Sequence, residues 1–307
     1  MKASSFYSKI LLFGEYGIIE DSKGLSIPYN SFEGHLKIPN VHSKRTKYSN
    51  SILYNFCKYL KQLTELEINL IFFEKDLKDG LYFDSSIPMG YGVGSSGALV
   101  AAVYDKYSNN KIIASEELSR KKIFKLKTIF SKMESFFHGN SSGLDPLNSY
   151  LGLPILINSR NDLCITTIPY QKSVGAGAIF LIDSGQISST SHMVSIFTEK
   201  MKSDGFRKMI SSQFIKYTNL CVDSFISGDL NSLFVNTKKL SKIVLENFKP
   251  MIPYELHNLW KNGIDSGLYF LKLCGSGGGG YILGFTPDIE LAKNNLKDYN
   301  LEVVYQF

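Results

Sequence analysis

The sequence contains few cysteines, and no two of them lie close together in the sequence. The four cysteines lie far apart among 307 residues and form no CxxC, and the five histidines have no zinc-ligand spacing. The pattern therefore indicates neither a disulfide framework nor a zinc site. A reducing, cytoplasmic compartment is the simplest expectation.

Long hydrophobic runs are also absent. No apolar stretch approaches the ~20 residues that are needed to cross a bilayer. The first residues, MKASSFYSKILLFGEYG, could be mistaken for a secretory signal, but Lys9 and Glu15 bracket an apolar run that is too short. No small-residue cleavage site follows it. We therefore expect a soluble protein with no membrane partner.

A strong charge bias is missing as well. The chain has 34 lysines and arginines against 28 aspartates and glutamates, which gives a net charge of +6. These residues are scattered, and no basic face with interleaved aromatic residues stands out, so we expect no nucleic-acid partner. The basic excess suits an anionic ligand, although such an excess is more often only a solvated surface.

The residues that are present predict a mixed α+β protein of two domains, or of one large one. Apolar periodicity predicts helices at residues 51–63, 116–137, 191–226, 229–246 and 254–262, with further helices beginning near 98 and 288. Apolar runs predict strands at residues 10–13, 17–19, 36–38, 66–73, 81–87, 177–183 and 301–305. We expect the domain change near residues 150–180 and find no internal repeat.

The stretch 87–107, IPMGYGVGSSGALVAAVYDKY, places four glycines in a few residues before a predicted helix. A strand, a glycine-rich turn and a helix N-terminus bring several backbone N–H groups to one point, which is an arrangement that binds phosphate. Gly92, Gly94 and Gly97 fit GxGxxG, but the βαβ context is missing and no P-loop lysine follows. A tight turn with a serine helix cap is the alternative.

A second stretch with candidate chemistry is ESFFHGNSSGLD, from Glu134 to Asp145. Glu134 edges an apolar seam near the end of a predicted helix, where it either extends to water or binds a metal. Asp145 precedes Pro146, which fits a helix N-cap, but its carboxylate could also accept a proton from a substrate hydroxyl. Lys9 enters an apolar strand and needs a carboxylate partner if it is buried.

Taken together, the segments KILLFGEYGII (9–19), PMGYGVGSSGA (88–98) and KLCGSGGGGY (272–281) resemble the three motifs of the GHMP kinases. The resemblance implies the two-domain GHMP kinase fold, with an N-terminal domain like ribosomal protein S5 domain 2 at residues 1–170. It implies a ferredoxin-like C-terminal domain at 171–307, with ATP bound between the two.

Within this family, the mevalonate-kinase branch is most similar, because Glu134 is followed by HGNSSGLD, which places Asp145 eleven positions later (145 − 134). The segment DSGQISST (183–190) is similar to another element of that branch. The resemblance therefore implies an isoprenoid-pathway kinase that phosphorylates the C5 hydroxyl of mevalonate with ATP and Mg²⁺, and it allows a homodimer.

The resemblance also implies roles for individual residues. Asp145 would be the catalytic base and Lys9 its charge partner, while Ser96 and Glu134 would hold Mg²⁺. The residues implied to wrap the triphosphate are Pro88, Gly90, Gly92, Gly94, Ser95, Ser96, Gly97 and Ala98. Those implied to lie near the substrate are Glu15, Tyr16, His138, Thr190, Gly277 and Gly278.

Three departures from the mevalonate-kinase pattern concern the substrate. The turn reads Gly14-Glu15-Tyr16, the phosphate loop ends in GSSG, and Ser141 replaces a usual proline. The first two are more typical of phosphomevalonate kinases, which are the nearest alternative. A diphosphomevalonate decarboxylase lacks the Glu…HGxxSGxD element. A catalytically dead sensor of the same fold would have lost one of Lys9, Ser96, Glu134 and Asp145.

Overall fold

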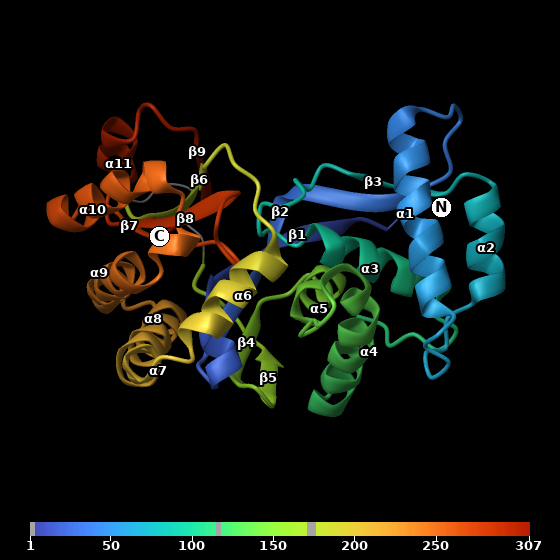
Figure 1. Ribbon diagram of the computed structural model, residues 1–307, viewed down its shortest axis with the longest axis horizontal. Helices are drawn as coiled ribbons and strands as arrows, with labels where there is room; N and C mark the ends of the chain where they lie inside the picture. Colours follow the sequence, from blue (N-terminus) through green and yellow to red (C-terminus); the bar gives the residue numbers. More distant parts are fainter. Residues whose placement is uncertain (1–3, 115–117, 171–175) are drawn as a thin grey trace. The chain divides into compact units, whose positions relative to one another are not determined.

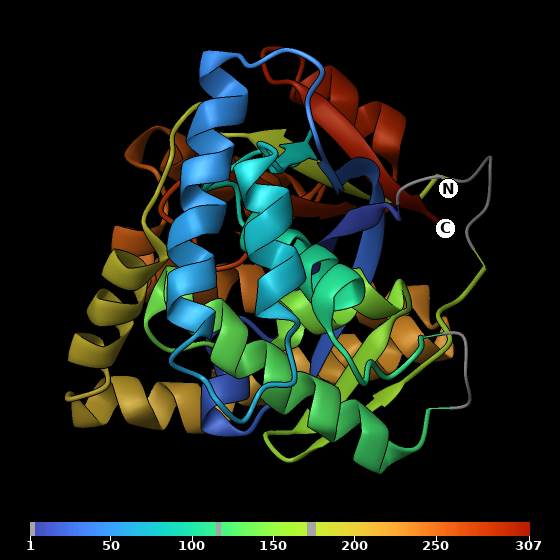
Figure 2. The same cartoon turned by 90° about the vertical axis from the view of Figure 1, so that its right-hand side faces the viewer.

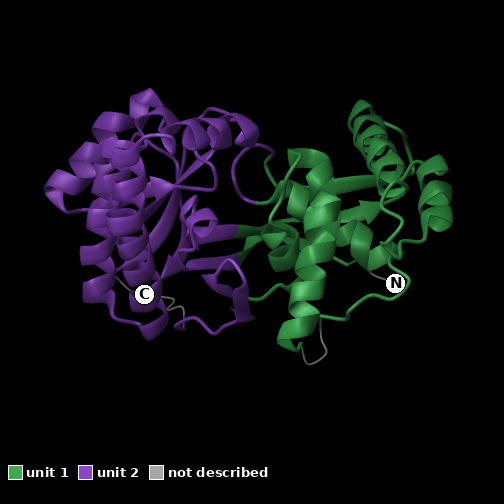
Figure 3. Cartoon of the chain, turned by 60° about the horizontal axis from the view of Figure 1, so that its bottom comes forward, with its two compact units in different colours: residues 1–9, 28–88, 94–153 green, residues 10–27, 89–93, 154–307 purple. Residues whose placement is uncertain are grey.

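The computed structural model describes residues 4–114, 118–170 and 176–307 and confirms the predicted α+β class (Figure 1). The chain forms two compact units, and each is assembled from separate segments (Figure 3). Unit 1 contains the described residues of 1–9, 28–88 and 94–153, and unit 2 contains those of 10–27, 89–93 and 154–307. The division into domains at 1–170 and 171–307 remains a prediction.

Unit 1 is mostly helical. Its helices are α1 (Lys44–Leu60), α2 (Leu70–Lys78), α3 (Ser95–Tyr107), α4 (Arg120–His138) and α5 (Leu144–Leu151). The strand β3 (Tyr82–Ser85) pairs antiparallel with the second half of β2 (Gly24–Lys37), so that His35 lies opposite Asp84. Helices α1 and α2 run side by side, as Figure 2 shows.

Helix α3 forms the centre of unit 1 and packs against both α4 and α5. From Gly97 to Tyr104 every residue of α3 is buried. A helix that is apolar all round belongs in a protein core, and small side chains such as Ala98, Ala101 and Ala102 let its neighbours approach closely. The N-terminus of α3, at the end of the glycine-rich loop, is thereby held by two other helices.

Unit 2 contains a four-stranded antiparallel sheet in the spatial order β7-β8-β6-β9. These strands are β6 (Ala178–Asp183), β7 (Phe270–Leu273), β8 (Tyr281–Thr286) and β9 (Leu301–Gln306). Helices follow β6 and separate β8 from β9, which gives the β-α-β-β-α-β order of a ferredoxin-like fold. The expected ferredoxin-like C-terminal region is therefore confirmed.

The helices of unit 2 carry much of its core. They are α6 (Thr190–Lys200), α7 (Asp204–Met209), α8 (Ile215–Ser227), α9 (Leu230–Asn247), α10 (His257–Ser266) and α11 (Ile289–Asn295), with the short helical turns η1 (Gly17–Glu20), η2 (Ile210–Phe214), η3 (Lys249–Met251) and η4 (Tyr254–Leu256). Trp260 of α10 is fully buried, and its indole N–H donates to the Ser241 hydroxyl at 2.8 Å.

Three more strands complete the secondary structure. The strand β1 (Phe6–Phe13) lies next to β2 in the sheet that also contains β3. In unit 2 the start of β2 pairs antiparallel with β4 (Ile155–Ser159), which pairs in turn with β5 (Asp162–Ile165). None of the helices in the described ranges is both long and apolar enough to cross a bilayer.

Two of the predicted strands are wrong. Residues 17–19 form the 3₁₀ turn η1, because the turn begins at Tyr16 with a left-handed backbone that a strand cannot accommodate. Residues 70–73 of the predicted strand 66–73 begin α2 instead, because the Asn69 side chain accepts a hydrogen bond from the Phe72 N–H and caps a helix. The helix predicted at 116–137 begins at Arg120, and its first predicted residue, Glu116, lies outside the described residues.

Candidate active site

The glycine-rich loop leads into α3 through Gly94. Gly94 is the N-cap residue and has a left-handed backbone (φ +84°), which favours glycine over any residue with a Cβ. The predicted serine cap is therefore wrong, since no side chain caps this helix. The N–H groups of the first helical turn have no partner within the helix and suit a phosphate.

The loop residues named by the sequence are divided between the two units. Gly90 and Gly92 belong to the segment 89–93 of unit 2 and both have positive φ angles, of +79° and +78°. Pro88 and the residues from Gly94 onward belong to unit 1. The triphosphate-binding role of this loop therefore remains a prediction about residues of both units.

An ion pair joins Lys9 to Asp145 within unit 1. The Lys9 Nζ lies 3.0 Å from the Asp145 Oδ1, and the lysine side chain is only 4% exposed whereas the aspartate side chain is 37% exposed. Lys9 is therefore a buried cation with the carboxylate partner that the sequence required. The exposed face of the carboxylate leaves room for a substrate group.

Asp145 is held in place by a close approach of two helices. It is the second residue of α5, whose N-cap is Gly143, so the expectation that Asp145 itself caps the helix is wrong. A Cβ on Gly97 of α3 would lie 2.7 Å from the Asp145 carbonyl carbon and 2.9 Å from the Asp145 Cβ. Gly97 therefore allows the start of α5, with its carboxylate, to lie against the first turn of α3.

Glu134 is a buried carboxylate of unit 1. Its exposed fraction is 3%, the Ser96 hydroxyl donates to its Oε1 at 3.1 Å, and the Ser141 hydroxyl donates to its Oε2. The Nε2 of His138 lies 3.0 Å from the Ser96 Oγ. Residues from α3, α4 and the loop before α5 thus meet at one carboxylate.

The electrostatics of this cluster disfavour a bare negative charge. Burial, together with the charge of Asp145, raises the pKa of Glu134 to about 8. Burial also lowers the pKa of the neighbouring His138, so neither side chain readily carries its charge. A cation bound at Glu134 would favour the ionised carboxylate.

The donor set fits Mg²⁺ shared with phosphate. A carboxylate and a hydroxyl 3.1 Å apart are hard oxygen ligands of the kind that Mg²⁺ prefers. Across the part of the chain that the structure describes, no three His, Cys, Asp or Glu side chains gather as a metal site. Ser96 and Glu134 therefore suit a metal whose remaining ligands are phosphate oxygens and water.

Glu15 and Tyr16, which the family resemblance implies to lie near the substrate, are in the turn after β1 in unit 2. Glu15 forms a buried ion pair with Lys272 of β7, and the two side chains are 6% and 3% exposed. Tyr16 has a positive φ of 58°, and its hydroxyl donates to the Ser276 carbonyl oxygen at 2.6 Å. The Ser276 hydroxyl lies 3.5 Å from the Thr190 Oγ1.

Gly277 and Gly278 pack against other parts of unit 2. A Cβ on Gly277 would lie 2.7 Å from the Met251 carbonyl oxygen, and the Gly278 N–H donates to that same oxygen at 2.6 Å. A Cβ on Gly278 would also lie 2.5 Å from the Met193 sulfur. These glycines therefore serve close packing within the unit, and their contact with substrate remains a prediction.

Two residues of these clusters were not named from the sequence. Lys272 stands in an apolar strand just as Lys9 does, so its position within KLCGSGGGGY was a signal that it needs a buried carboxylate partner. Ser141 was noted only as a departure from the family pattern. Its hydroxyl donates to Glu134 and also accepts from the Gly143 N–H at 3.0 Å, a role that no local pattern indicates.

Comparison with known proteins gives consistent results. The family model of the GHMP kinases N terminal domain matches residues 51–152. A mevalonate kinase of Pyrococcus abyssi (strain GE5 / Orsay) is 25% identical over 323 aligned residues, which cover 91% of this chain and 87% of that protein.

Solved structures with the same fold include two small-molecule kinases. The mevalonate kinase of L. major in complex with R-mevalonate superposes with a TM-score of 0.65 at 16% identity, covering 100% of this chain and 96% of that one. The Streptococcus pneumoniae phosphomevalonate kinase in complex with phosphomevalonate and AMPPNP gives a TM-score of 0.65 at 15% identity, covering 99% of each chain. At these identities the similarity establishes the fold.

Proposed function

Because the chain belongs to the GHMP kinase family, we propose that it is a mevalonate kinase that uses ATP and Mg²⁺ to phosphorylate the C5 hydroxyl of mevalonate in isoprenoid precursor synthesis. The observation that carries the proposal is the pairing of Lys9 with Asp145 at 3.0 Å, in the same unit as the Ser96–Glu134 pair. One carboxylate is thus available for a proton and another for a metal.

In the proposed reaction, the C5 oxygen attacks the γ-phosphorus of ATP and a new O–P bond forms. The bond between the γ-phosphorus and the β–γ bridging oxygen breaks, ADP leaves, and the hydroxyl proton passes to the Asp145 carboxylate. The Lys9 ammonium, held 3.0 Å from that carboxylate, orients it. No oxidation or reduction occurs.

Mg²⁺, when bound, supplies positive charge that neutralises the phosphate oxygens. Ser96 and Glu134 are the residues that would hold it, and Ser141 keeps the second oxygen of Glu134 oriented. Since a phosphoryl-transfer transition state disperses charge over the phosphate oxygens, positioning and electrostatics carry most of the catalysis. The N-terminus of α3 would contribute backbone N–H groups to the same phosphates.

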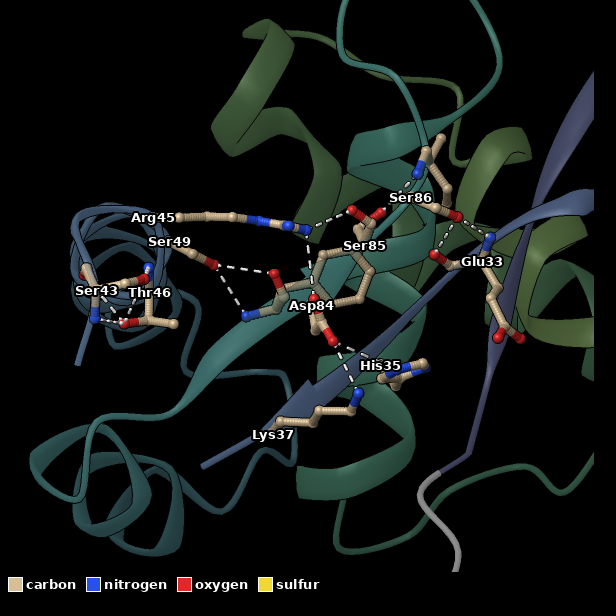
Figure 4. A network of polar contacts seen from close by, with 12 residues as sticks. Glu33, His35, Lys37, Ser43, Arg45, Thr46, Ser49, Asp84, Ser85 and Ser86 are labelled. Atoms are coloured by element: carbon tan, nitrogen blue, oxygen red, sulfur yellow. Dashed lines mark hydrogen bonds and ion pairs between the residues drawn. The ribbon is translucent and has the colours of Figure 1, made fainter. Parts of the chain in front are cut away.

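A hollow on the surface of unit 1 is a candidate for the nucleoside. Its volume is about 290 Å³, near the lower end of small-molecule sites, and its lining includes Arg45, Asp84 and Ser86. Figure 4 shows Arg45 reaching from α1 to Asp84 and Ser85, with His35 and Lys37 approaching Asp84 from β2. Ser86 precedes Pro88 by only two positions, so a nucleoside here would lie beside the start of the phosphate loop.

The alternative acceptor is phosphomevalonate. The sequence Gly14-Glu15-Tyr16 and the GSSG ending of the phosphate loop favour it, and a phosphomevalonate kinase has the same fold at the same TM-score. That acceptor carries an extra phosphate and needs additional cations around it. Within unit 2, the proposed acceptor contacts are Glu15, Tyr16, Thr190, Gly277 and Gly278, as the family resemblance implies.

The experiment compares wild type with Asp145→Asn, in ADP-release assays with mevalonate and phosphomevalonate as acceptors. We expect turnover on mevalonate, and a loss of at least ~10³-fold in kcat for Asp145→Asn because the base is removed. The affinity for ATP should stay within about twofold. Wild-type turnover by the variant would show that Asp145 is not the base. Turnover on phosphomevalonate, with none on mevalonate, would show that phosphomevalonate is the acceptor.

A further inference from the structure

Tyr91 lies between Gly90 and Gly92 of the phosphate loop, and other residues of unit 2 contact its ring and its main chain. Its ring packs edge-on against the ring of Tyr281, with centroids 5.0 Å apart and an interplanar angle of 67°. Burial, followed by the charge of Asp183, raises the pKa of its hydroxyl. Its carbonyl oxygen accepts a hydrogen bond from the Tyr281 N–H at 3.4 Å.

Tyr281 and its strand partner Asp183 lie on the two central strands of the sheet of unit 2. Asp183 ends β6 and Tyr281 begins β8, and the two residues are direct partners in the antiparallel register of these central strands. The Asp183 Oδ1 accepts a hydrogen bond from the Gly185 N–H at 2.8 Å. Tyr281, the partner of Tyr91, is therefore fixed by the sheet.

The backbone of the loop also fits closely against the residue before Tyr281. Gly280 has a φ of +69°, and a Cβ there would lie 2.4 Å from the Tyr91 Cα and 2.9 Å from the Gly90 carbonyl oxygen. The second glycine cluster thus leaves space for Tyr91. The contacts to Tyr91 involve its main chain and its ring.

We propose that Tyr281 is a positioning residue that acts through Tyr91 to set the conformation of the phosphate loop for nucleotide binding. The proposal rests on the proposed function, because it takes this loop as the nucleotide site. Glycines on both sides of Tyr91 make the loop costly to order. Anchoring Tyr91 before the nucleotide arrives removes part of that cost from binding.

The test measures MgADP binding by calorimetry for wild type, Tyr91→Phe and Tyr91→Leu. Tyr91→Leu loses the ring contact with Tyr281, and should raise the Kd for MgADP by about 2- to 10-fold. Tyr91→Phe keeps the ring and should bind MgADP as wild type does. The KM for mevalonate and the thermal midpoint should not change.

Two further variants separate positioning from a general effect. Tyr281→Leu should weaken MgADP binding like Tyr91→Leu, and the double variant should be no weaker than the worse single variant, because both remove one contact. Tyr254→Leu, a change at a tyrosine that is 83% exposed in unit 2, is the matched control and should bind as wild type.

The outcomes distinguish this proposal from the proposed function. If wild type binds MgADP but does not phosphorylate mevalonate, the acceptor is wrong while the comparison of variants still decides the role of Tyr91. Unchanged MgADP binding by Tyr91→Leu overturns the positioning role. A lower thermal midpoint in Tyr91→Leu, with equal losses of affinity for both substrates, also overturns it. Absence of MgADP binding by wild type would overturn it as well.

Discussion

At the scale of single residues, Gly97 links the phosphate loop to the proposed base. A Cβ at this position would overlap the backbone of Asp145 and the Pro146 nitrogen, which lies 2.8 Å away. The start of α5 would have to move outward by several tenths of an ångström at least. Since α3 packs against both α4 and α5, we expect the start of α5 to shift, and the Asp145 carboxylate to shift with it.

We therefore expect Gly97→Ala to lower kcat by about 10- to 100-fold, because small misplacements of a catalytic group are costly. Steady-state kinetics with mevalonate and ATP would measure the effect. Gly205→Ala in α7 is a matched control, because its Cβ would meet only the Ser203 hydroxyl at 3.9 Å. Unchanged kcat in Gly97→Ala would mean that α5 does not fix the position of Asp145.

The buried ion pair between Lys272 and Glu15 has a second consequence at this scale. Removing one partner takes the opposite charge away from a charge that stays buried, which is more costly than removing both. We expect Lys272→Met to lower the free energy of unfolding by about 3–5 kcal/mol. Urea denaturation would measure it.

The double variant Lys272→Met/Glu15→Gln provides the control for this prediction. Because it replaces the pair with two neutral side chains, it should recover a large part of the lost stability. If the double variant were as unstable as Lys272→Met, the lost packing of the lysine side chain would explain the effect and the ion pair would not.

At the scale of elements, Asp84 connects β3 to β2 and α1. Its carboxylate lies 2.8 Å from the Lys37 Nζ and 3.3 Å from the Arg45 Nη2, and His35 also faces it. The hydrogen bond from Lys37, followed by the charges of Lys37, Arg45 and His35, lowers the pKa of Asp84 despite its partial burial. The folded state therefore favours the ionised form.

The sign of the pH dependence follows from that shift. A depressed carboxyl pKa stabilises the fold above the pKa of the unfolded chain, about 3.9, and this contribution is lost as the pH falls through the folded value. We expect wild type to exceed Asp84→Asn by about 1 kcal/mol between pH 5 and 8, after allowance for solvent screening. Urea denaturation should find this difference shrinking below pH 4, and a difference independent of pH would contradict the assignment.

The helices and strands show how much of the secondary structure local sequence patterns can predict. The long amphipathic helix at 120–138 and the buried strand at 178–183 could be predicted, because each has a single clear period or a continuous apolar run. The run LIFF at the start of α2 is too short to distinguish a strand from a helix, and the cap by Asn69 decided it. The turn at Tyr16 depends on a positive φ that no residue type there signals.

At the scale of the whole molecule, the family motifs identified the candidate residues, but their partners came from distant parts of the chain. Lys9 and Asp145 could both be named from sequence, and their pairing could be expected from the need to compensate a buried cation. Glu15 and Lys272 are separated by 257 positions, so no local pattern could join them. The Tyr91 contacts likewise depend on the register of β6 against β8.

The segmented composition of unit 2 has a consequence for synthesis on the ribosome. Residues 10–27 belong to this unit, yet most of its remaining residues lie between 154 and 307. At translation rates of about 5–20 residues per second, the early segment waits on the order of tens of seconds for its partners. During that interval the apolar strand that carries Phe13 has no native core to join, and slower or faster translation should alter how much nascent chain aggregates.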